Sequence, residues 1–149
     1  MKKIFIYYSL SGNGDTVATY LKEKGIVTRK VIPVKQLPSN RILSILSGGF
    51  LAFKEYQDKL DNYDSNVKDY DEVIIGSPIW NGRLSCPINT VLNKTNLKNK
   101  KLIFILYSGS GNAPKATKKI NSLYPNATII NIKEPKNNSK ELINSLNKI

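Results

Sequence analysis

The sequence contains no histidine and only one cysteine, Cys86, among its 149 residues. Without histidine, neither a Ser-His-Asp triad nor a His-ligated metal site can be built, and proton transfer near pH 7 lacks its usual side chain. A single cysteine cannot form an internal disulfide, nor a zinc or iron–sulfur site that needs several thiolates. We therefore do not expect side-chain acid–base catalysis or a bound metal.

Long apolar segments are also missing. The longest runs, such as Leu102 to Tyr107, span six residues, whereas a membrane helix needs about 20. The chain opens with Met1-Lys2-Lys3 and an apolar run that stops at Ser9, without the cleavage site of a secretory leader. Hydrophobic residues make up 40% and charged residues 23%, as in globular domains. We expect one cytoplasmic domain comprising residues 1–149 and no association with membranes.

Acidic residues are scarce: 11 Asp and Glu stand against 23 Lys and Arg, which gives a formal net charge of +12. The lysines are spread from Lys2 to Lys148, with dense groups only within 98–101 and 115–119. Proteins that bind nucleic acids usually concentrate basic residues on one face and interleave aromatic side chains. Neither pattern is clear here, so we do not expect nucleic acid as the partner, although the charge keeps this alternative open.

Apolar, β-branched runs predict five strands, and helical spacing of apolar residues predicts helices between them. The expected strands are 3–8, 27–34, 71–76, 101–107 and 127–132, and the expected helices are 15–24, 87–93, 113–124 and 139–147. This alternation implies parallel β-α-β units, and strands apolar throughout imply a sheet covered on both faces. We predict a three-layer, doubly wound five-stranded α/β fold with ligands at the carboxyl ends of the strands. The segment 38–70 is the least regular, with a candidate helix at 41–46 and an aromatic group within 47–56.

A loop of small residues follows the first expected strand and opens a helix: Ser9-Leu10-Ser11-Gly12-Asn13-Gly14-Asp15-Thr16. Small residues let the backbone approach a ligand, and the first amides of a helix point donors outward at its positive dipole end. The loop is either a phosphate cradle, with added hydroxyls from Ser9, Ser11 and Thr16, or a tight turn capped by Asp15 or Ser11. A Walker loop is excluded because no Gly-Lys-Ser/Thr follows, and the dinucleotide pattern fails at Val17.

Two further loops follow the third and fourth expected strands. The first, Gly76-Ser77-Pro78-Ile79-Trp80-Asn81-Gly82-Arg83, carries the only tryptophan. Trp80 either caps the local core or offers a flat face to a planar ring. The second, Ser108-Gly109-Ser110-Gly111-Asn112, is either a flexible turn or a backbone shelf beside a ring. Because the three loops converge at one edge of a doubly wound sheet, they suit a phosphate joined to a planar heterocycle.

This combination resembles the flavodoxin family, and specifically its short single-domain members. The family's N-terminal pattern is matched at Tyr7, Ser9, Gly12, Ala18 and Leu21. Gly14 stands where the family has a phosphate-binding Thr. The Gly-Ser-Pro-Ile-Trp stretch, with Pro87 downstream, and the Ser-Gly-Ser-Gly loop also match. The resemblance covers essentially the whole chain and implies a flavodoxin-like sheet with strand order 2-1-3-4-5.

The resemblance implies a carrier of flavin mononucleotide (FMN). Its phosphate is expected on Ser9, Ser11, Gly12, Asn13, Gly14 and Thr16, largely through backbone amides. Its isoalloxazine ring is expected between Ser77, Pro78, Ile79, Trp80, Asn81 and Gly82 on one side and Ser108, Gly109, Ser110, Gly111 and Asn112 on the other. The Asn81-Gly82 peptide can flip toward the flavin, because both residue types adopt positive φ readily. On the same resemblance, Gly14→Thr should leave FMN binding unchanged or tighten it.

Three functions fit this pattern. The first is electron transfer between soluble redox proteins, a reductase and an acceptor, with FMN supplying the chemistry. The second is a flavin reductase that passes hydride from a nicotinamide to a quinone or nitro compound, and the third is a flavin-free interaction module. Flavodoxins are typically acidic, so a partner that recognises an acidic rim would not be steered in the same way to this basic chain.

Overall fold

Five parallel strands form the central sheet. The structure is a computed structural model that describes residues 1–35, 57–147 and 149. The parallel strands are β1 (Lys3–Tyr7), β2 (Val27–Lys30), β3 (Glu72–Trp80), β5 (Lys101–Ser108) and β6 (Thr128–Lys133). They are ordered β2-β1-β3-β5-β6, which is the expected order 2-1-3-4-5 when only the parallel strands are counted. The predicted doubly wound fold is confirmed.

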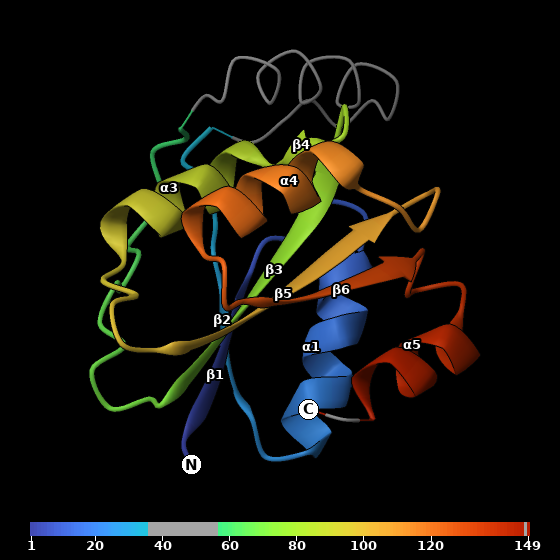
Figure 1. The fold of residues 1–149 in the computed structure, drawn as a ribbon, viewed down its shortest axis with the longest axis horizontal. Helices are drawn as coiled ribbons and strands as arrows, with labels where there is room; N and C mark the ends of the chain where they lie inside the picture. The colour runs from blue at the N-terminus through green and yellow to red at the C-terminus, as the bar shows by residue number, and fades with distance from the viewer. Residues whose placement is uncertain (36–56, 148) are drawn as a thin grey trace.

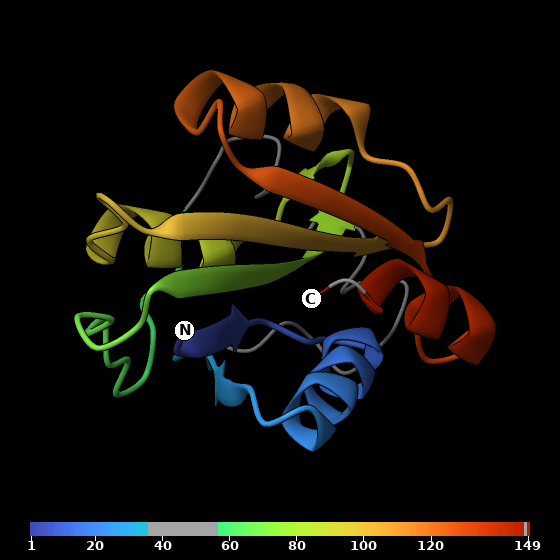
Figure 2. The ribbon, with the colours of Figure 1, turned by 60° about the horizontal axis from the view of Figure 1, so that its bottom comes forward.

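Helices cover both faces of this sheet (Figure 1). On one face lie α1 (Asn13–Glu23) and α5 (Ser139–Leu146), and on the other lie α3 (Cys86–Lys94) and α4 (Pro114–Leu123). Figure 2 shows the same three layers after a rotation of 60°. Within the described residues, no helix combines the length and the hydropathy that a bilayer crossing would require. The loops after β1, β3, β5 and β6 all leave the carboxyl edge of the sheet, where a ligand site is expected.

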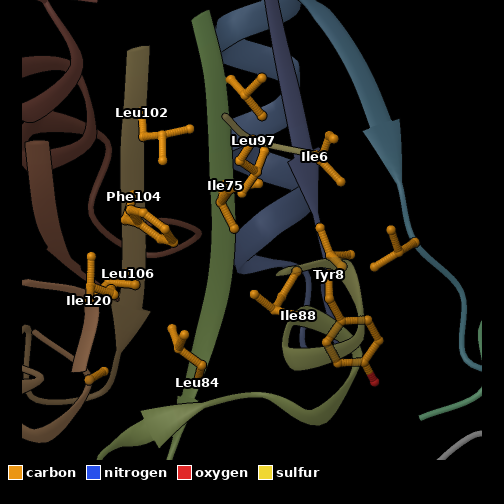
Figure 3. Close-up of a cluster of buried hydrophobic side chains, with 14 of the residues drawn as sticks. Ile6, Tyr8, Ile75, Leu84, Ile88, Leu97, Leu102, Phe104, Leu106 and Ile120 are labelled. Atoms are coloured by element: carbon orange, nitrogen blue, oxygen red, sulfur yellow. The ribbon is translucent and has the colours of Figure 1, made fainter. Parts of the chain in front are cut away.

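Alternating side chains of the strands build a separate hydrophobic core on each face. In β1, Ile4 and Ile6 join the core under α3 and α4, whereas Phe5 and Tyr7 join the core under α1 and α5. Figure 3 shows part of the first core, in which Ile6, Ile75 and Phe104 of neighbouring strands point to the same side of the sheet. Because both faces are buried, the central positions of β1, β3 and β5 are apolar on both sides of the sheet, at 4–7, 73–75 and 102–107.

The end of β3 differs from the prediction. The expected strand ended at Gly76, but β3 continues to Trp80 and turns through Asn81 and Gly82 into β4 (Arg83–Leu84). An Asn-Gly pair favours a two-residue hairpin turn, and this turn extends the strand by pairing it with β4. Trp80 therefore occupies the last position of a strand, paired with Arg83, rather than a loop.

β2 is shorter than predicted. It ends at Lys30 instead of Val34, and Pro33 beyond it forms an isolated antiparallel bridge with Leu60. Proline lacks the amide that a continuing parallel ladder would use, which explains the early end. The helix expected at 41–46 lies outside the described residues, and so does the aromatic segment 47–56.

The buried core predicts a clear difference between two truncations. Phe104→Ala removes a fully buried ring in the core under α3 and α4, so it should lower the free energy of unfolding by about 3–5 kcal/mol. Leu123→Ala, at a side chain that is 57% exposed, is the matched control and should change it by less than about 0.5 kcal/mol. Urea unfolding measures both variants, and similar losses would contradict this assignment of the core.

Candidate functional site

The loop after β1 presents four backbone amides without partners. The amides of Ser11, Gly12, Asn13 and Gly14 donate no hydrogen bond to any described residue. They lie at the start of α1, where the helix dipole adds partial positive charge. Gly12 adopts a left-handed conformation, with φ 94°, immediately before the helix. Four unpaired donors at a helix N-terminus can bind an anion such as a phosphate group.

The hydroxyls around this cradle are partly engaged. Ser9 Oγ accepts a hydrogen bond from the Asp15 amide, a donor in the first turn of α1, at 3.3 Å. The prediction had expected Asp15 or Ser11, and not Ser9, to cap this helix. Thr16 donates both its amide and its hydroxyl to the Gly12 carbonyl, at 3.0 and 3.1 Å. The hydroxyl proton of Ser11 therefore remains available to a ligand, whereas the Ser9 hydroxyl also interacts with the Asp15 carboxylate and both donors of Thr16 are used within the helix.

The Asp15 carboxylate lies beside the cradle but is held by β1 and β2. It is 2.7 Å from Lys30 Nζ and accepts a hydrogen bond from the Tyr7 hydroxyl at 3.1 Å. Partial burial raises the pKa of Asp15, but Lys30, Ser9 and Tyr7 outweigh it and lower the pKa below its usual value. Asp15 is therefore ionised at neutral pH, and the Lys30 ammonium offsets its charge beside the expected phosphate.

Tyr107 of β5 fills the space next to Gly14. Tyr107 is buried, and its hydroxyl donates a hydrogen bond to the Tyr8 carbonyl. A Cβ atom on Gly14 would lie 2.5 Å from the Tyr107 hydroxyl oxygen and 2.8 Å from the Tyr8 carbonyl oxygen. No side chain fits there unless Tyr107 or the backbone moves. Gly14→Thr therefore needs a shift of Tyr107 or of the backbone, and the expectation that it leaves FMN binding unchanged or tightens it stays a prediction.

The second loop is a two-residue hairpin turn. Asn81 and Gly82 have φ values of 50° and 76°, as expected for a type I′ turn. Trp80, just before the turn, is half-buried and packs edge-on against Tyr8, with 5.7 Å between ring centroids and an interplanar angle of 89°. Trp80 thus packs on the core and also stays partly exposed. Both interpretations of Trp80, as a cap on the core and as a face for a planar ring, are compatible with this position.

The residues before the turn are largely directed inward. Ser77 is fully buried, and its Oγ accepts a hydrogen bond from the Ser85 amide at 3.1 Å. Pro78 is in register with Tyr107, and Ile79 packs against the core under α3 and α4. The side chain of Ser77 therefore holds β3 to the start of α3, and the exposed part of this loop is its tip.

The third loop, Ser108 to Asn112, is organised by its own side chains. Ser108 Oγ accepts a hydrogen bond from the Gly111 amide at 3.0 Å, and Ser110 Oγ donates to the Asn112 carbonyl at 3.1 Å. A Cβ atom on Gly109 would meet nothing within 4 Å. These bonds favour a preformed shelf over a flexible turn, with open space beside Gly109 for a planar group.

Sequence reasoning missed three lysines at this edge. Lys136, Lys115 and Lys133 lie over Gly12, Gly82 and Gly111, respectively, and each of these glycines has a positive φ. Lys133 is the last residue of β6 and Lys136 lies in the loop after it, a region that the prediction did not consider as part of the site. The predicted topology already placed the end of this strand at the ligand edge, so that signal was present in the sequence.

Cys86 is buried at the start of α3. Burial, with a contribution from the nearby Asp58, raises the pKa of its thiol to about 12. Because the thiolate is the nucleophilic form, the protonated thiol is poorly suited to covalent catalysis at neutral pH. In the part of the chain that the structure describes, no group of three or more His, Cys, Asp or Glu residues is arranged to hold a metal ion.

Comparisons with known proteins agree with this geometry. The sequence model of the flavodoxin family, described as "Flavodoxin", matches residues 52–148, more than half of the chain. A candidate flavoprotein from Bacteroides eggerthii has a similar fold, with a TM-score of 0.74 and 20% identity over 97% of both chains. A flavoprotein in complex with FMN from Lactobacillus acidophilus has a TM-score of 0.67 and 22% identity, over 94% of this chain and 97% of that one. Oxidised flavodoxin 1 from Bacillus cereus has a TM-score of 0.50 and 15% identity, over 97% and 95%. No curated protein sequence matches significantly.

The contact between Tyr107 and Gly14 predicts a double-mutant cycle. Gly14→Thr should lower the free energy of unfolding by about 1–3 kcal/mol through overpacking. Tyr107→Phe should cost about 1–3 kcal/mol because it leaves the Tyr8 carbonyl without its donor. In the Tyr107→Phe background, Gly14→Thr should cost less, since the colliding hydroxyl oxygen is gone.

Urea unfolding without added ligand measures all variants of this cycle. Gly109→Ala is the matched control, because the space beside Gly109 is open, and it should change stability by less than about 0.5 kcal/mol. If Gly14→Thr were as stable as the wild type, or if its cost were the same in both backgrounds, the proposed constraint would be wrong.

Proposed function

Since the chain belongs to the flavodoxin family, we propose that it binds FMN and carries electrons between soluble redox proteins. The observation that carries this proposal is the row of unpaired amides from Ser11 to Gly14, at the same sheet edge as two other ligand-facing loops. A phosphate on these amides would leave the attached ring system between the hairpin tip at Trp80 and the shelf at Gly109. The flavoprotein of similar fold from Lactobacillus acidophilus has been solved in complex with FMN.

Each loop has a separate role in this proposal. The cradle amides, with the hydroxyl of Ser11, hold the phosphate, and α1 adds the field of its dipole. Trp80 covers one side of the ring and excludes water from it, while the Ser108–Asn112 shelf keeps bulky side chains away from the other side. Bound FMN supplies the electron-transfer chemistry, which the side chains of this chain do not provide.

The flavin-free alternative depended on the missing threonine hydroxyl at position 14. The structure gives that absence another cause, because Tyr107 occupies the space in which such a side chain would lie. The amide of Gly14 donates to no described residue, so the cradle keeps this donor for an anion. The Tyr107 side chain fills the space that a threonine at position 14 would need. The absence of that threonine therefore does not favour the flavin-free alternative.

The first test of this proposal compares FMN with riboflavin, which has the same ring but no phosphate. Because the cradle is built for an anion, FMN should bind about tenfold more tightly or better, a difference of about 1.4 kcal/mol. Quenching of flavin fluorescence during titration of the apoprotein gives both affinities, and the purified complex should be yellow. Equal affinities would disprove the role of the cradle, and a colourless protein that rejects added FMN would disprove the proposed function.

Trp80→Ala tests the placement of the ring. The substitution should weaken FMN binding by about 1–3 kcal/mol, as for bases stacked on aromatic side chains, and should restore flavin emission at saturating ligand. Because Trp80 is half-buried against Tyr8, the substitution should also destabilise the apoprotein, by less than the roughly 3 kcal/mol of a fully buried ring.

Tyr124→Ala is the control for Trp80→Ala. The half-buried Tyr124 ring packs on Phe104 at the far end of α4, so its loss should lower stability without changing FMN affinity. Unchanged FMN affinity in Trp80→Ala would place the ring elsewhere.

A further inference from the structure

Three exposed lysines surround the ligand edge, and we call Lys115, Lys133 and Lys136 the lysine rim. They come from the first turn of α4, the end of β6 and the loop between β6 and α5. A Cβ atom on the facing glycine would lie 3.2 Å from Lys115 Cδ, 2.9 Å from Lys133 Cβ and 3.4 Å from Lys136 Cδ. Each of the three expected ligand loops therefore has one lysine against its glycine: Lys115 and Lys136 approach with their side-chain stems, and Lys133 with its backbone and Cβ atom.

Among the described residues, no ion pair cancels the positive charge of the rim. None of the three lysines forms a salt bridge with a described residue. The nearby carboxylates are engaged elsewhere: Asp15 pairs with Lys30, and Glu141 accepts hydrogen bonds from the Lys133 backbone amide and the Asn138 side chain. Residues 133–138 contain one further acid, Glu134, against two lysines. The rim therefore carries net positive charge.

Packing against glycine explains the position of the Lys115 and Lys136 side chains at the ligand edge. A long lysine stem covers apolar surface while its ammonium group stays in water. Because the glycines have no side chains, the stems of Lys115 and Lys136 lie directly on the backbone of the second and first loops, and the end of β6 at Lys133 lies against Gly111 of the third. The Nζ atom of Lys136 is 3.6 Å from a Cβ position on Gly12, at the entrance of the cradle.

We propose that the lysine rim is the docking surface for a redox protein that presents acidic side chains around its own redox centre. This inference rests on the proposed function, because it takes the exposed edge of bound FMN as the point of electron transfer. Complementary charges around two redox centres steer the partners into the orientation that brings the centres together. In the transfer, one electron passes from the bound reduced flavin to the partner's one-electron acceptor, and no bond is formed or broken.

Nucleic acid is the other polyanion that a basic surface could attract. Single-stranded nucleic acid is usually bound by a continuous basic groove with aromatic side chains on which bases stack. The rim instead has three separate lysines arranged around the expected cofactor, and the aromatic side chain beside it, Trp80, is half-buried against Tyr8. The position of the lysines thus favours an acidic protein partner over nucleic acid.

The test uses two sets of substitutions that change the net charge equally. Lys115→Met, Lys133→Met and Lys136→Met together remove the charges of the rim but keep long side chains. The control triple carries Lys22→Met, Lys94→Met and Lys98→Met, which are exposed positions at or beyond helix C-terminal ends, near the opposite edge of the sheet. All rates are measured at saturating FMN, so that any change in cofactor affinity does not enter the comparison.

The probes are two one-electron oxidants of opposite charge, hexacyanoferrate(III), a trivalent anion, and tris(phenanthroline)cobalt(III), a trivalent cation. Stopped-flow oxidation of the reduced, FMN-loaded wild type by the anion should slow as salt is added. The rim triple should lower this rate about tenfold at low salt, and the control triple by less than about threefold. The cationic oxidant should show the opposite trend. Equal effects of the two triples would mean that total charge, and not the rim, determines the rate, and would overturn the proposal.

A second readout does not depend on electron transfer. In NMR titrations, a decaglutamate peptide should shift the amide signals of residues 115, 133 and 136 and their neighbours, and the rim triple should abolish these shifts. If decathymidylate bound the rim about tenfold more tightly than the peptide at equal salt, a nucleic acid would be the partner and the proposal would be wrong.

FMN binding and the docking surface are tested separately. FMN binding by the wild type is measured first, and its absence would disprove the proposed function and, with it, a docking surface for electron transfer. If FMN binds but neither oxidant nor peptide distinguishes the rim from the control lysines, the proposed function stands and the docking surface is disproved.

Discussion

The hydrogen bond from the Tyr107 hydroxyl to the Tyr8 carbonyl determines the shape of the ligand edge. It joins the end of β5 to the end of β1, beneath the start of α1. Burial raises the pKa of Tyr107 well above its usual value, so the hydroxyl stays protonated and remains a donor at any ordinary pH. Because it occupies the space next to Gly14, the cradle must present backbone there, and the amides from Ser11 to Gly14 become the groups that a ligand meets.

The sequence predicted the sheet because its strands carry their own signal. β1, β3 and β5 are buried on both faces, so each carries a continuous apolar run at its centre, and turn residues mark most of their ends. The prediction failed at the end of β3, where Asn81-Gly82 forms a hairpin that pairs Trp80 with Arg83. Asn-Gly is a strong hairpin signal, so this boundary could have been found. The contact of Tyr107 with Tyr8 could not, since it spans 99 residues and depends on the register of three strands.

In the candidate site, too, one part could be predicted from the sequence and another part could not. Its glycines and serines lie close together in sequence, so the loops could be identified as motifs before their geometry was known. The lysine rim is different, because its members appear in the sequence as parts of an even spread of basic residues. They form a group only when the ends of β3, β5 and β6 are placed side by side. Net charge therefore gave the sign of the surface potential, and the fold was needed to show where the charges gather.

The loop after β6 connects the rim with the cradle. The Lys136 backbone amide donates a hydrogen bond to Asn13 Oδ1 at 3.0 Å, and the Glu134 amide donates to the Ser108 carbonyl at 3.0 Å. One short segment thus holds the first and the third loops of the candidate site and carries Lys136 at its surface. If the proposed partner docks on Lys136, it will contact the residue whose amide binds Asn13 in the cradle. In that proposal, cofactor retention and partner docking would depend on the same few hydrogen bonds, because one segment carries both the charge and the contacts to the loops.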